Sequence, residues 1–123
     1  MRLRPLALVI EDDSDTRGMY AFVLGQEGFV VAEARDGREG LRKAMQTLPD
    51  LIITDIDMPV IDGWETIGRL KADDRTGHIP IIVCSGHPQH TPGGPDVAAH
   101  LVKPCSPEAL RLTVRRLLRR TES

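Results

Sequence analysis

The sequence predicts an α/β fold, a parallel β-sheet covered by helices on both faces. Two observations lead to this prediction. Short apolar runs alternate along the chain with segments whose apolar residues recur at helical spacing, about five times in all. The runs are apolar at consecutive positions rather than at every second one, which is typical of parallel strands buried on both faces.

The first strand is expected over residues 6–10, a continuous apolar run. Ser14 or Asp15 then has the side chain to cap a helix, and Gly28 ends it. The buried face of this helix is apolar at helical spacing, through Met19, Tyr20, Val23 and Leu24.

The second strand is expected over residues 29–32. Asp36 and Gly37 then turn the chain into a second helix, which ends before Pro49. The i, i+3, i+4, i+7 pattern of an amphipathic helix is formed here by Leu41, Ala44, Met45 and Leu48.

The third strand is expected over residues 51–54, a β-branched apolar run that passes into Asp55 and Asp57. Its acidic end matters because open α/β sheets bind ligands in the crevice beyond the carboxyl ends of their strands. A third helix follows, with Trp64, Ile67 and Leu70 at helical spacing, and it fades out over residues 73–77.

The fourth strand is expected over residues 81–84 and a short fifth strand over 101–102. Ser106 then caps the last helix and Pro107 opens it, a position where proline is favoured. The inner face of this helix carries Leu110, Val114, Leu117 and Leu118.

The stretch between the fourth and fifth strands interrupts the repeat. It contains Pro88, Pro92, Gly93, Gly94 and Pro95, which the interior of a regular helix does not tolerate. We expect the fourth helix of the repeat to be shortened to one or two turns or to be absent.

Five strands joined by right-handed crossovers leave few topologies, of which the flavodoxin-like order 2-1-3-4-5 is the commonest. The predicted architecture is therefore a three-layer α/β/α sandwich. This order places the first and third strands side by side at the switch point of the sheet. The acids Glu11 and Asp12 are then expected beside Asp55.

Composition predicts one domain over residues 1–123, of an ordinary globular protein. A net charge of -2 gives no sign of a nucleic-acid partner. The apolar run near the N-terminus stops at three acids, unlike a signal peptide, and Cys84 and Cys105 lack metal-site spacing. We expect a cytoplasmic protein with free thiols.

Carboxylates, a hydroxyl and an ammonium group are expected together at the carboxyl edge of the sheet: Glu11, Asp12, Asp55, Ser85 and Lys103. Crowded carboxylates repel one another, so they need a compensating cation, and hard oxygen ligands with open positions suit Mg²⁺. A carboxylate next to a metal and a lysine is equipped to attack a phosphoryl group and hold the product.

Four motifs now carry a family resemblance. VIEDD at 9–13, DIDMPVIDG at 55–63, IIVCSG at 81–86 and LVKP at 101–104 resemble, in this order and spacing, the response regulator receiver domain of two-component signalling. The resemblance covers essentially the whole chain. Each motif is unspecific alone, but four in order on the expected elements are specific.

The resemblance implies that Asp55 accepts a phosphoryl group from a phosphohistidine of a sensor histidine kinase or phosphotransfer protein. The domain would catalyse its own phosphorylation and dephosphorylation without being a conventional enzyme. Glu11 and Asp12 match the acidic pair that holds Mg²⁺, together with Asp55, and the backbone carbonyl of Asp57 matches a further ligand.

Further matches concern the handling of the bound phosphate. Ser85 matches the hydroxyl residue that moves toward the phosphate, and Lys103 matches the lysine that pairs with it. Gly86 matches a small residue whose backbone faces the accessible phosphate. Pro104 matches a proline whose preceding peptide bond is typically cis.

One position departs from the family. His100 stands where an aromatic switch residue that rotates inward on activation is common, so a smaller, titratable ring replaces it. Signalling is expected to run through contact with a downstream protein, with no membrane and no nucleic acid.

Two other function classes remain open. A pseudo-receiver would keep the fold and bind a partner without phosphorylation. Asp55 and Asp57 also fit the start of the haloacid-dehalogenase-type phosphatase motif, although Pro59 stands where that motif has Thr or Val and the motif lies on the third strand rather than the first.

Several residues near these motifs have simpler roles. We expect Asp62 to form a turn with Gly63 and Asp13 to be a solvated residue at a helix start rather than a metal ligand. Cys84 is expected in the core. The arginines of the last helix suit its C-terminal end, where basic residues complement the helix dipole.

Overall fold

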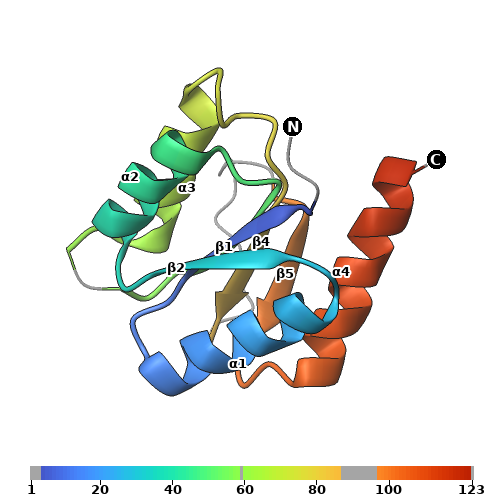
Figure 1. Cartoon of the computed structure of the whole chain (residues 1–123). Helices are drawn as coiled ribbons and strands as arrows, with labels where there is room; N and C mark the ends of the chain where they lie inside the picture. Colours follow the sequence, from blue (N-terminus) through green and yellow to red (C-terminus); the bar gives the residue numbers. More distant parts are fainter. Residues whose placement is uncertain (1–3, 59, 87–96, 123) are drawn as a thin grey trace.

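The computed structural model describes residues 4–58, 60–86 and 97–122. Within these ranges, nine elements follow one another (Figure 1): β1 (Leu6–Ile10), α1 (Ser14–Gln26), β2 (Val30–Ala34), α2 (Gly37–Thr47), β3 (Leu51–Asp55), α3 (Gly63–Ala72), β4 (Ile81–Ser85), β5 (Ala99–Val102) and α4 (Pro107–Glu122). The alternation of strands and helices confirms the predicted α/β class.

The five strands form one parallel sheet in the order β2-β1-β3-β4-β5, as the sequence predicted. Strand β1 therefore lies between β2 and β3. The register pairs Ile10 at the end of β1 with Thr54 of β3. The residues that follow β1 thus lie beside Asp55, the last residue of β3.

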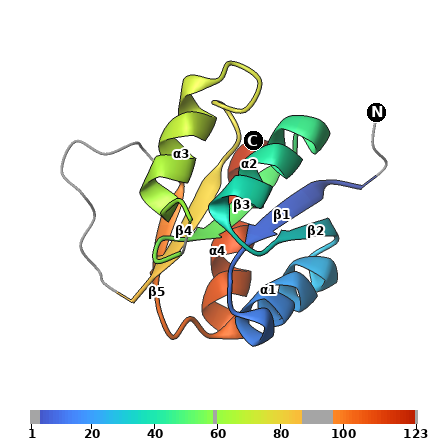
Figure 2. The same ribbon diagram turned by 90° about the vertical axis from the view of Figure 1, so that its left-hand side faces the viewer.

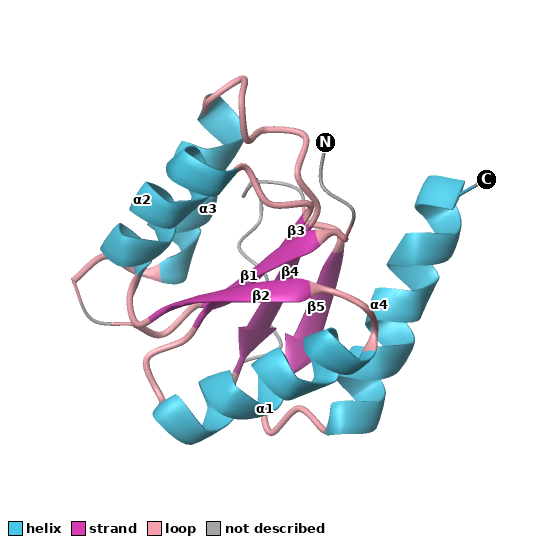
Figure 3. Ribbon diagram, viewed as in Figure 1, coloured by secondary structure: helices cyan, strands magenta, loops and turns pink. Residues whose placement is uncertain are grey.

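Helices cover both faces of the sheet (Figures 1, 2 and 3). Helices α1 and α4 lie on one face, and α2 and α3 lie on the other. Successive residues of β1 point to opposite faces, so Ala7 and Val9 pack in the core under α1 and α4, whereas Leu8 and Ile10 pack under α2 and α3. The sheet is therefore buried on both sides, which explains its continuous apolar strands.

Several strand boundaries differ from the prediction. Strand β2 ends at Ala34 rather than at residue 32, β3 and β4 each extend one residue further than expected, and β5 begins at Ala99 rather than at residue 101. Strand β2 begins at Val30 rather than at Phe29, because the N–H of Phe29 donates to the carbonyl of Leu24 and completes the end of α1. Gly28, at φ +97, allows the chain to turn there. Phe29 remains in the core although it precedes the strand.

The start of α1 is also shifted. Asp13, not Ser14 or Asp15, caps this helix: its carboxylate accepts the N–H of Thr16 at 2.9 Å. Asp13 has extended backbone angles and Ser14 is already helical. The cap therefore lies one residue earlier than predicted, and Asp13 is exposed at a helix start, as expected.

The segment between β4 and β5 was predicted to lack a full helix. Most of it, residues 87–96, lies outside the described residues, and the described residues on either side, Gly86, Val97 and Ala98, are not helical. The last helix, α4, is capped by Ser106, whose hydroxyl accepts the N–H of Ala109 at 3.0 Å. Across the described ranges, no helix is long and apolar enough to cross a membrane.

Both cysteines are free thiols in the structure. Cys84 on β4 and Cys105 before α4 belong to the core under α1 and α4, which confirms the interpretation of Cys84 as a core residue. The contact with Cys105, together with burial, raises the pKa of the Cys84 thiol.

Candidate functional site

The carboxyl ends of four strands bring the predicted polar residues to one edge of the sheet. Glu11 and Asp12 directly follow β1, and Asp55 ends β3. Ser85 ends β4, and Lys103 follows β5. Residues that lie up to 92 positions apart in the sequence are thereby joined in one cluster.

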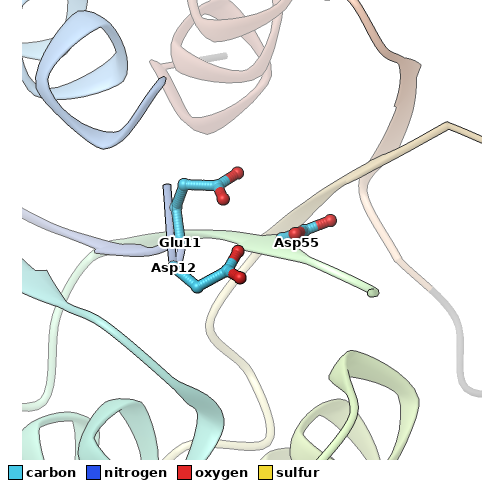
Figure 4. Close-up of side chains that lie close together, drawn as sticks. All are labelled: Glu11, Asp12 and Asp55. Carbon is cyan, nitrogen blue, oxygen red and sulfur yellow. The ribbon is translucent and has the colours of Figure 1, made fainter. Parts of the chain in front are cut away.

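Three carboxyl groups lie close together in this cluster. One oxygen each of Glu11, Asp12 and Asp55 lies within 4.8 Å of the others, and Figure 4 shows the three groups side by side. Glu11 has no exposed surface and Asp55 is 3% exposed, whereas Asp12 is open to solvent. The cluster therefore has a buried floor and one accessible carboxylate.

Lys103 supplies the positive charge at this site. Its Nζ lies 2.8 Å from Oε1 of Glu11 and 3.2 Å from Oδ2 of Asp55. The lysine side chain is 27% exposed. One ammonium group thus pairs with both buried carboxylates, while Asp12 adds a third negative charge.

Burial controls the ionisation of the two carboxyl groups. Loss of solvation raises the pKa of Glu11 and of Asp55, and the Lys103 ammonium only partly opposes this effect. For Lys103 itself, burial acts to lower the pKa, but its bonds to Glu11 and Asp55 outweigh that effect and raise it. Further positive charge at the site would therefore stabilise the ionised carboxylates.

The backbone beyond Asp55 is held by the start of α3. The N–H of Asp57 donates to Oδ1 of Asp55 at 3.3 Å, and the N–H of Gly63 donates to the carbonyl of Ile56 at 2.9 Å. Asp62, predicted as a turn residue, caps α3 by accepting the N–H of Glu65. A Cβ on Gly63 would lie 2.2 Å from the carbonyl oxygen of Asp55, so only glycine fits there.

Ser85 and His100 form a polar contact beside the cluster. Oγ of Ser85 lies 3.2 Å from Nε2 of His100, and the backbone carbonyl of Ser85 accepts the N–H of Lys103 at 2.7 Å. The Trp64 ring meets the His100 ring edge-on, with centroids 6.5 Å apart and an angle of 74°. The family resemblance drew attention to His100, but nothing in the sequence pattern predicted this contact.

Arg17 is a second feature that the sequence analysis missed. Its Nη1 donates to the backbone carbonyl of Glu11 at 2.9 Å, and its Nε pairs with Glu33 on β2 at 3.2 Å. The arginine thereby fixes the turn that carries Glu11 and Asp12. An arginine in the first helical turns has no distinguishing sequence signal, because solvated arginines are common there.

The remaining predicted positions lie around this cluster. Gly86 and the Asp57 side chain are exposed, and the Lys103–Pro104 peptide bond is cis. Asp13 uses its carboxylate to cap α1 and to bind the Thr16 hydroxyl at 2.6 Å. The Asp13 carboxylate is therefore engaged in capping the helix rather than pointing into the acidic cluster as a metal ligand.

Comparisons with known proteins match most of the chain to one family model. A family model described as the response regulator receiver domain matches residues 7–115. The chain is 37% identical over 122 residues to the DNA-binding dual master transcriptional regulator RpaA of Synechocystis sp., covering 96% of this chain and 51% of that protein. It is also 37% identical to the transcriptional regulatory protein PrrA of Mycobacterium tuberculosis, covering 97% of this chain and 52% of PrrA.

Among solved structures, the chemotaxis response regulator CheY4 of Vibrio cholerae is similar over nearly its full length. The TM-score is 0.84 at 30% identity, with 93% of this chain and 98% of that chain covered. The chain spans about half the length of the curated regulators that it matches. The likeness therefore concerns about half the length of those regulators and nearly the whole of the CheY4 chain.

Proposed function

Since the chain belongs to the response regulator receiver domain family, we propose that Asp55 accepts a phosphoryl group from a phosphohistidine of a histidine kinase or phosphotransfer protein. Receiver domains act with histidine kinases in two-component systems. The observation that supports Asp55 most strongly is its pairing with Lys103 at 3.2 Å, next to Glu11 and Asp12.

The proposed transfer needs a nucleophile and a place for negative charge. A carboxylate oxygen of Asp55 attacks phosphorus, a P–O bond forms, the P–N bond of the phosphohistidine breaks, and the kinase imidazole leaves. Lys103 Nζ lies close enough to Asp55 to pair with an oxygen of the transferred group. Lys103 would then exchange one carboxylate partner for the phosphoryl group.

The acidic cluster suits Mg²⁺ in its donor chemistry. Glu11, Asp12 and Asp55 offer hard carboxylate oxygens within 4.8 Å of one another, one from an exposed residue. We assign the metal to these three groups and to the backbone carbonyl of Asp57. A bound Mg²⁺ would neutralise the carboxylates and the charge on the phosphoryl oxygens.

Two residues at the carboxyl end of β4, Ser85 and the following Gly86, would contact the phosphoryl group. The Ser85 hydroxyl would donate a hydrogen bond to a phosphoryl oxygen, and the backbone of exposed Gly86 would leave room beside it. His100, in contact with Ser85, takes the position of the switch residue. Pro104 completes the Lys103–Pro104 turn that follows β5.

We propose that the signal is read by a protein that contacts this domain, in the cytoplasm. The matched relatives RpaA and PrrA carry names of transcriptional regulators and are about twice as long. The intact mass of the protein from its native source tests whether residues 1–123 act within a longer regulator.

Mass spectrometry tests the chemistry directly. The protein is incubated with a small acyl phosphate with and without Mg²⁺, and the intact mass of wild type, Asp55→Asn and Asp74→Asn is measured. Asp74 is an exposed acid outside the cluster and serves as the control. A single Mg²⁺-dependent phosphoryl adduct is expected in wild type and Asp74→Asn and is expected to be absent in Asp55→Asn.

Other outcomes would favour the alternative functions. Wild type without an adduct in any condition would contradict the proposal and favour a pseudo-receiver that binds partners without phosphorylation. Continuous turnover of a phosphate ester would instead favour an Asp-nucleophile phosphatase.

A further inference from the structure

The contact between Ser85 and His100 has a chemical consequence for the proposed phosphorylation site. The register pairs His100 with Val83, so both side chains lie on the same face of the sheet. Ser85, two residues after Val83, points to that face too. Trp64 of α3 packs on this side of the sheet, which explains its edge contact with the His100 ring.

The hydroxyl of Ser85 has one proton to donate. In a neutral imidazole one ring nitrogen accepts and the other donates. If Nε2 of His100 accepts, Ser85 cannot donate the same proton to a phosphoryl oxygen on Asp55. Ser85 is 3% exposed and His100 is half-buried, so little water can replace this hydrogen bond and its loss is costly for Ser85.

We propose that His100 is a positioning residue: its Nε2 accepts the Ser85 proton in the unphosphorylated domain, and phosphorylation must replace that bond. The inference rests on the proposed function, because it assumes a phosphoryl group on Asp55. His100 thus opposes the phosphorylated state, by an amount set by the exchange of one hydrogen bond for another. A ring without an acceptor would not oppose it.

Two variants separate the acceptor from the ring. His100→Phe keeps a ring of similar shape against Trp64 but removes the acceptor. His100→Gln gives up the ring and keeps a side-chain oxygen that can accept the Ser85 proton. His78, an exposed histidine before the amino end of β4, supplies the control His78→Phe.

The probe is beryllium fluoride with Mg²⁺, which forms a tetrahedral phosphoryl analogue on a carboxylate. Trp64 is the only tryptophan of the sequence, and its contact with His100 makes its fluorescence a reporter of this site. The concentration of beryllium fluoride at the midpoint of the fluorescence change is measured for each variant, and the lifetime of the acyl phosphate adduct is measured by intact mass.

Exchange of one hydrogen bond predicts that His100→Phe binds the analogue about two- to tenfold more tightly than wild type. His100→Gln should restore binding to near the wild-type value, and His78→Phe should match wild type. In a Ser85→Ala background, His100→Phe should have no further effect, because the pair is already broken. The ¹⁵N signals of His100 should show an unprotonated Nε2 in the unmodified protein.

Several results would overturn the inference while leaving the proposed function intact. One is an unchanged fluorescence midpoint for His100→Phe, and another is an equal shift of the midpoint for His100→Phe and His100→Gln. The others are an effect of His100→Phe that persists in the Ser85→Ala background and a proton on Nε2 of His100 in the unmodified protein. A wild type that binds no analogue and forms no adduct would instead overturn the proposed function, and the inference with it.

Discussion

The ammonium nitrogen of Lys103 lies 2.8 Å from a carboxylate oxygen of Glu11, a residue without exposed surface. The two residues follow β5 and β1, strands that β3 and β4 separate in the sheet. The ion pair therefore crosses the carboxyl edge of the sheet and passes Asp55, which it also engages. The same ion pair therefore sets the charge of the site and stabilises this edge of the sheet.

Replacing Lys103 by methionine should destabilise the protein. The change leaves Glu11 and Asp55 buried without their cation, and removing one partner of a buried pair typically costs about 3–5 kcal/mol. Because the lysine is 27% exposed, we expect a smaller loss, about 2 kcal/mol at neutral pH. Urea unfolding measures it, with Arg42→Met, at an exposed position of α2, as the control for the loss of a basic side chain.

The pH dependence of that loss has a definite sign. The carboxyl groups of Glu11 and Asp55 already have raised pKa values, and without Lys103 these rise further. Protonated carboxyls need no counter-charge, so the difference between Lys103→Met and wild type should shrink as the pH falls. A difference that stays constant down to acid pH would contradict the ion-pair explanation.

Mg²⁺ should stabilise the folded protein through the acidic cluster. A ligand at a hundred times its Kd adds about 2.7 kcal/mol to the free energy of unfolding. Asp12→Asn should lose most of this gain, yet be no less stable than wild type without metal, because Asp12 is exposed among like charges. Thermal unfolding with and without Mg²⁺ measures both effects.

Asp15 provides the matched control for the metal experiment. It is an exposed acid in the first turn of α1, three residues from Asp12 in the sequence. Asp15→Asn should retain the full Mg²⁺ stabilisation. Equal losses in the two variants would indicate a general charge effect rather than a site.

Two glycines of α3 should respond to alanine in opposite directions. A Cβ on Gly63 would lie 2.2 Å from the carbonyl oxygen of Asp55 and 2.6 Å from Cα of Ile56, both backbone atoms. Gly63→Ala should therefore cost at least about 2 kcal/mol. Gly68 has nothing within 4 Å of its Cβ position, so Gly68→Ala should stabilise the helix by about 0.5–1 kcal/mol.

Chemical unfolding of the two alanine variants is the measurement. Loss of stability in both would mean that α3 does not tolerate a side chain for a reason other than this contact. Gly63→Ala should also weaken phosphoryl transfer, because relief of the overlap must displace the backbone of Asp55.

Glu27 should make folding stability sensitive to acid at the α1–α4 contact. Its carboxylate accepts hydrogen bonds from Nε and Nη2 of Arg115 at 2.8 and 3.2 Å, and these lower its pKa below 4.5. Because the folded pKa lies below the unfolded one, the stabilisation is complete above the unfolded value and is lost as the pH falls through the folded value.

Glu27→Gln removes this dependence. The variant should be less stable than wild type at neutral pH. The two free energies of unfolding should converge in acid, where protonated Glu27 is uncharged, like the glutamine. The free energy of unfolding as a function of pH measures the convergence. Curves that run parallel over the whole range would show that the Glu27–Arg115 bond does not contribute.

The strands and their order were predictable because local signals agree. Continuous apolar runs, Gly and Pro at the breaks, and right-handed crossovers together leave few arrangements. The start of α1 was less predictable, since Asp13, Ser14 and Asp15 are all residues that cap helices. The extended backbone of Asp13 decides between them, and backbone angles are not visible in a sequence.

The contacts of the candidate site likewise include some that the sequence predicts and others that it does not. The strand-end position of Glu11, Asp55 and Lys103 follows from the repeat, so their assembly was predictable. The hydrogen bond between Ser85 and His100 depends on the register of β4 against β5, and that of Arg17 depends on the path of a turn. Both are set by packing between distant segments rather than by local pattern.

The tight fit of Gly63 against Asp55 also determines how a displacement of the Asp55 backbone would reach α3. Gly63, the first residue of α3, lies against the carbonyl oxygen of Asp55 with no space for a methyl group. Its N–H donates to the backbone carbonyl of Ile56. Close-packed joints transmit displacement because they cannot absorb it. If Asp55 carries a phosphoryl group, as proposed, any shift of its backbone would therefore move the start of α3, and the helix would carry that movement to its far end at Ala72.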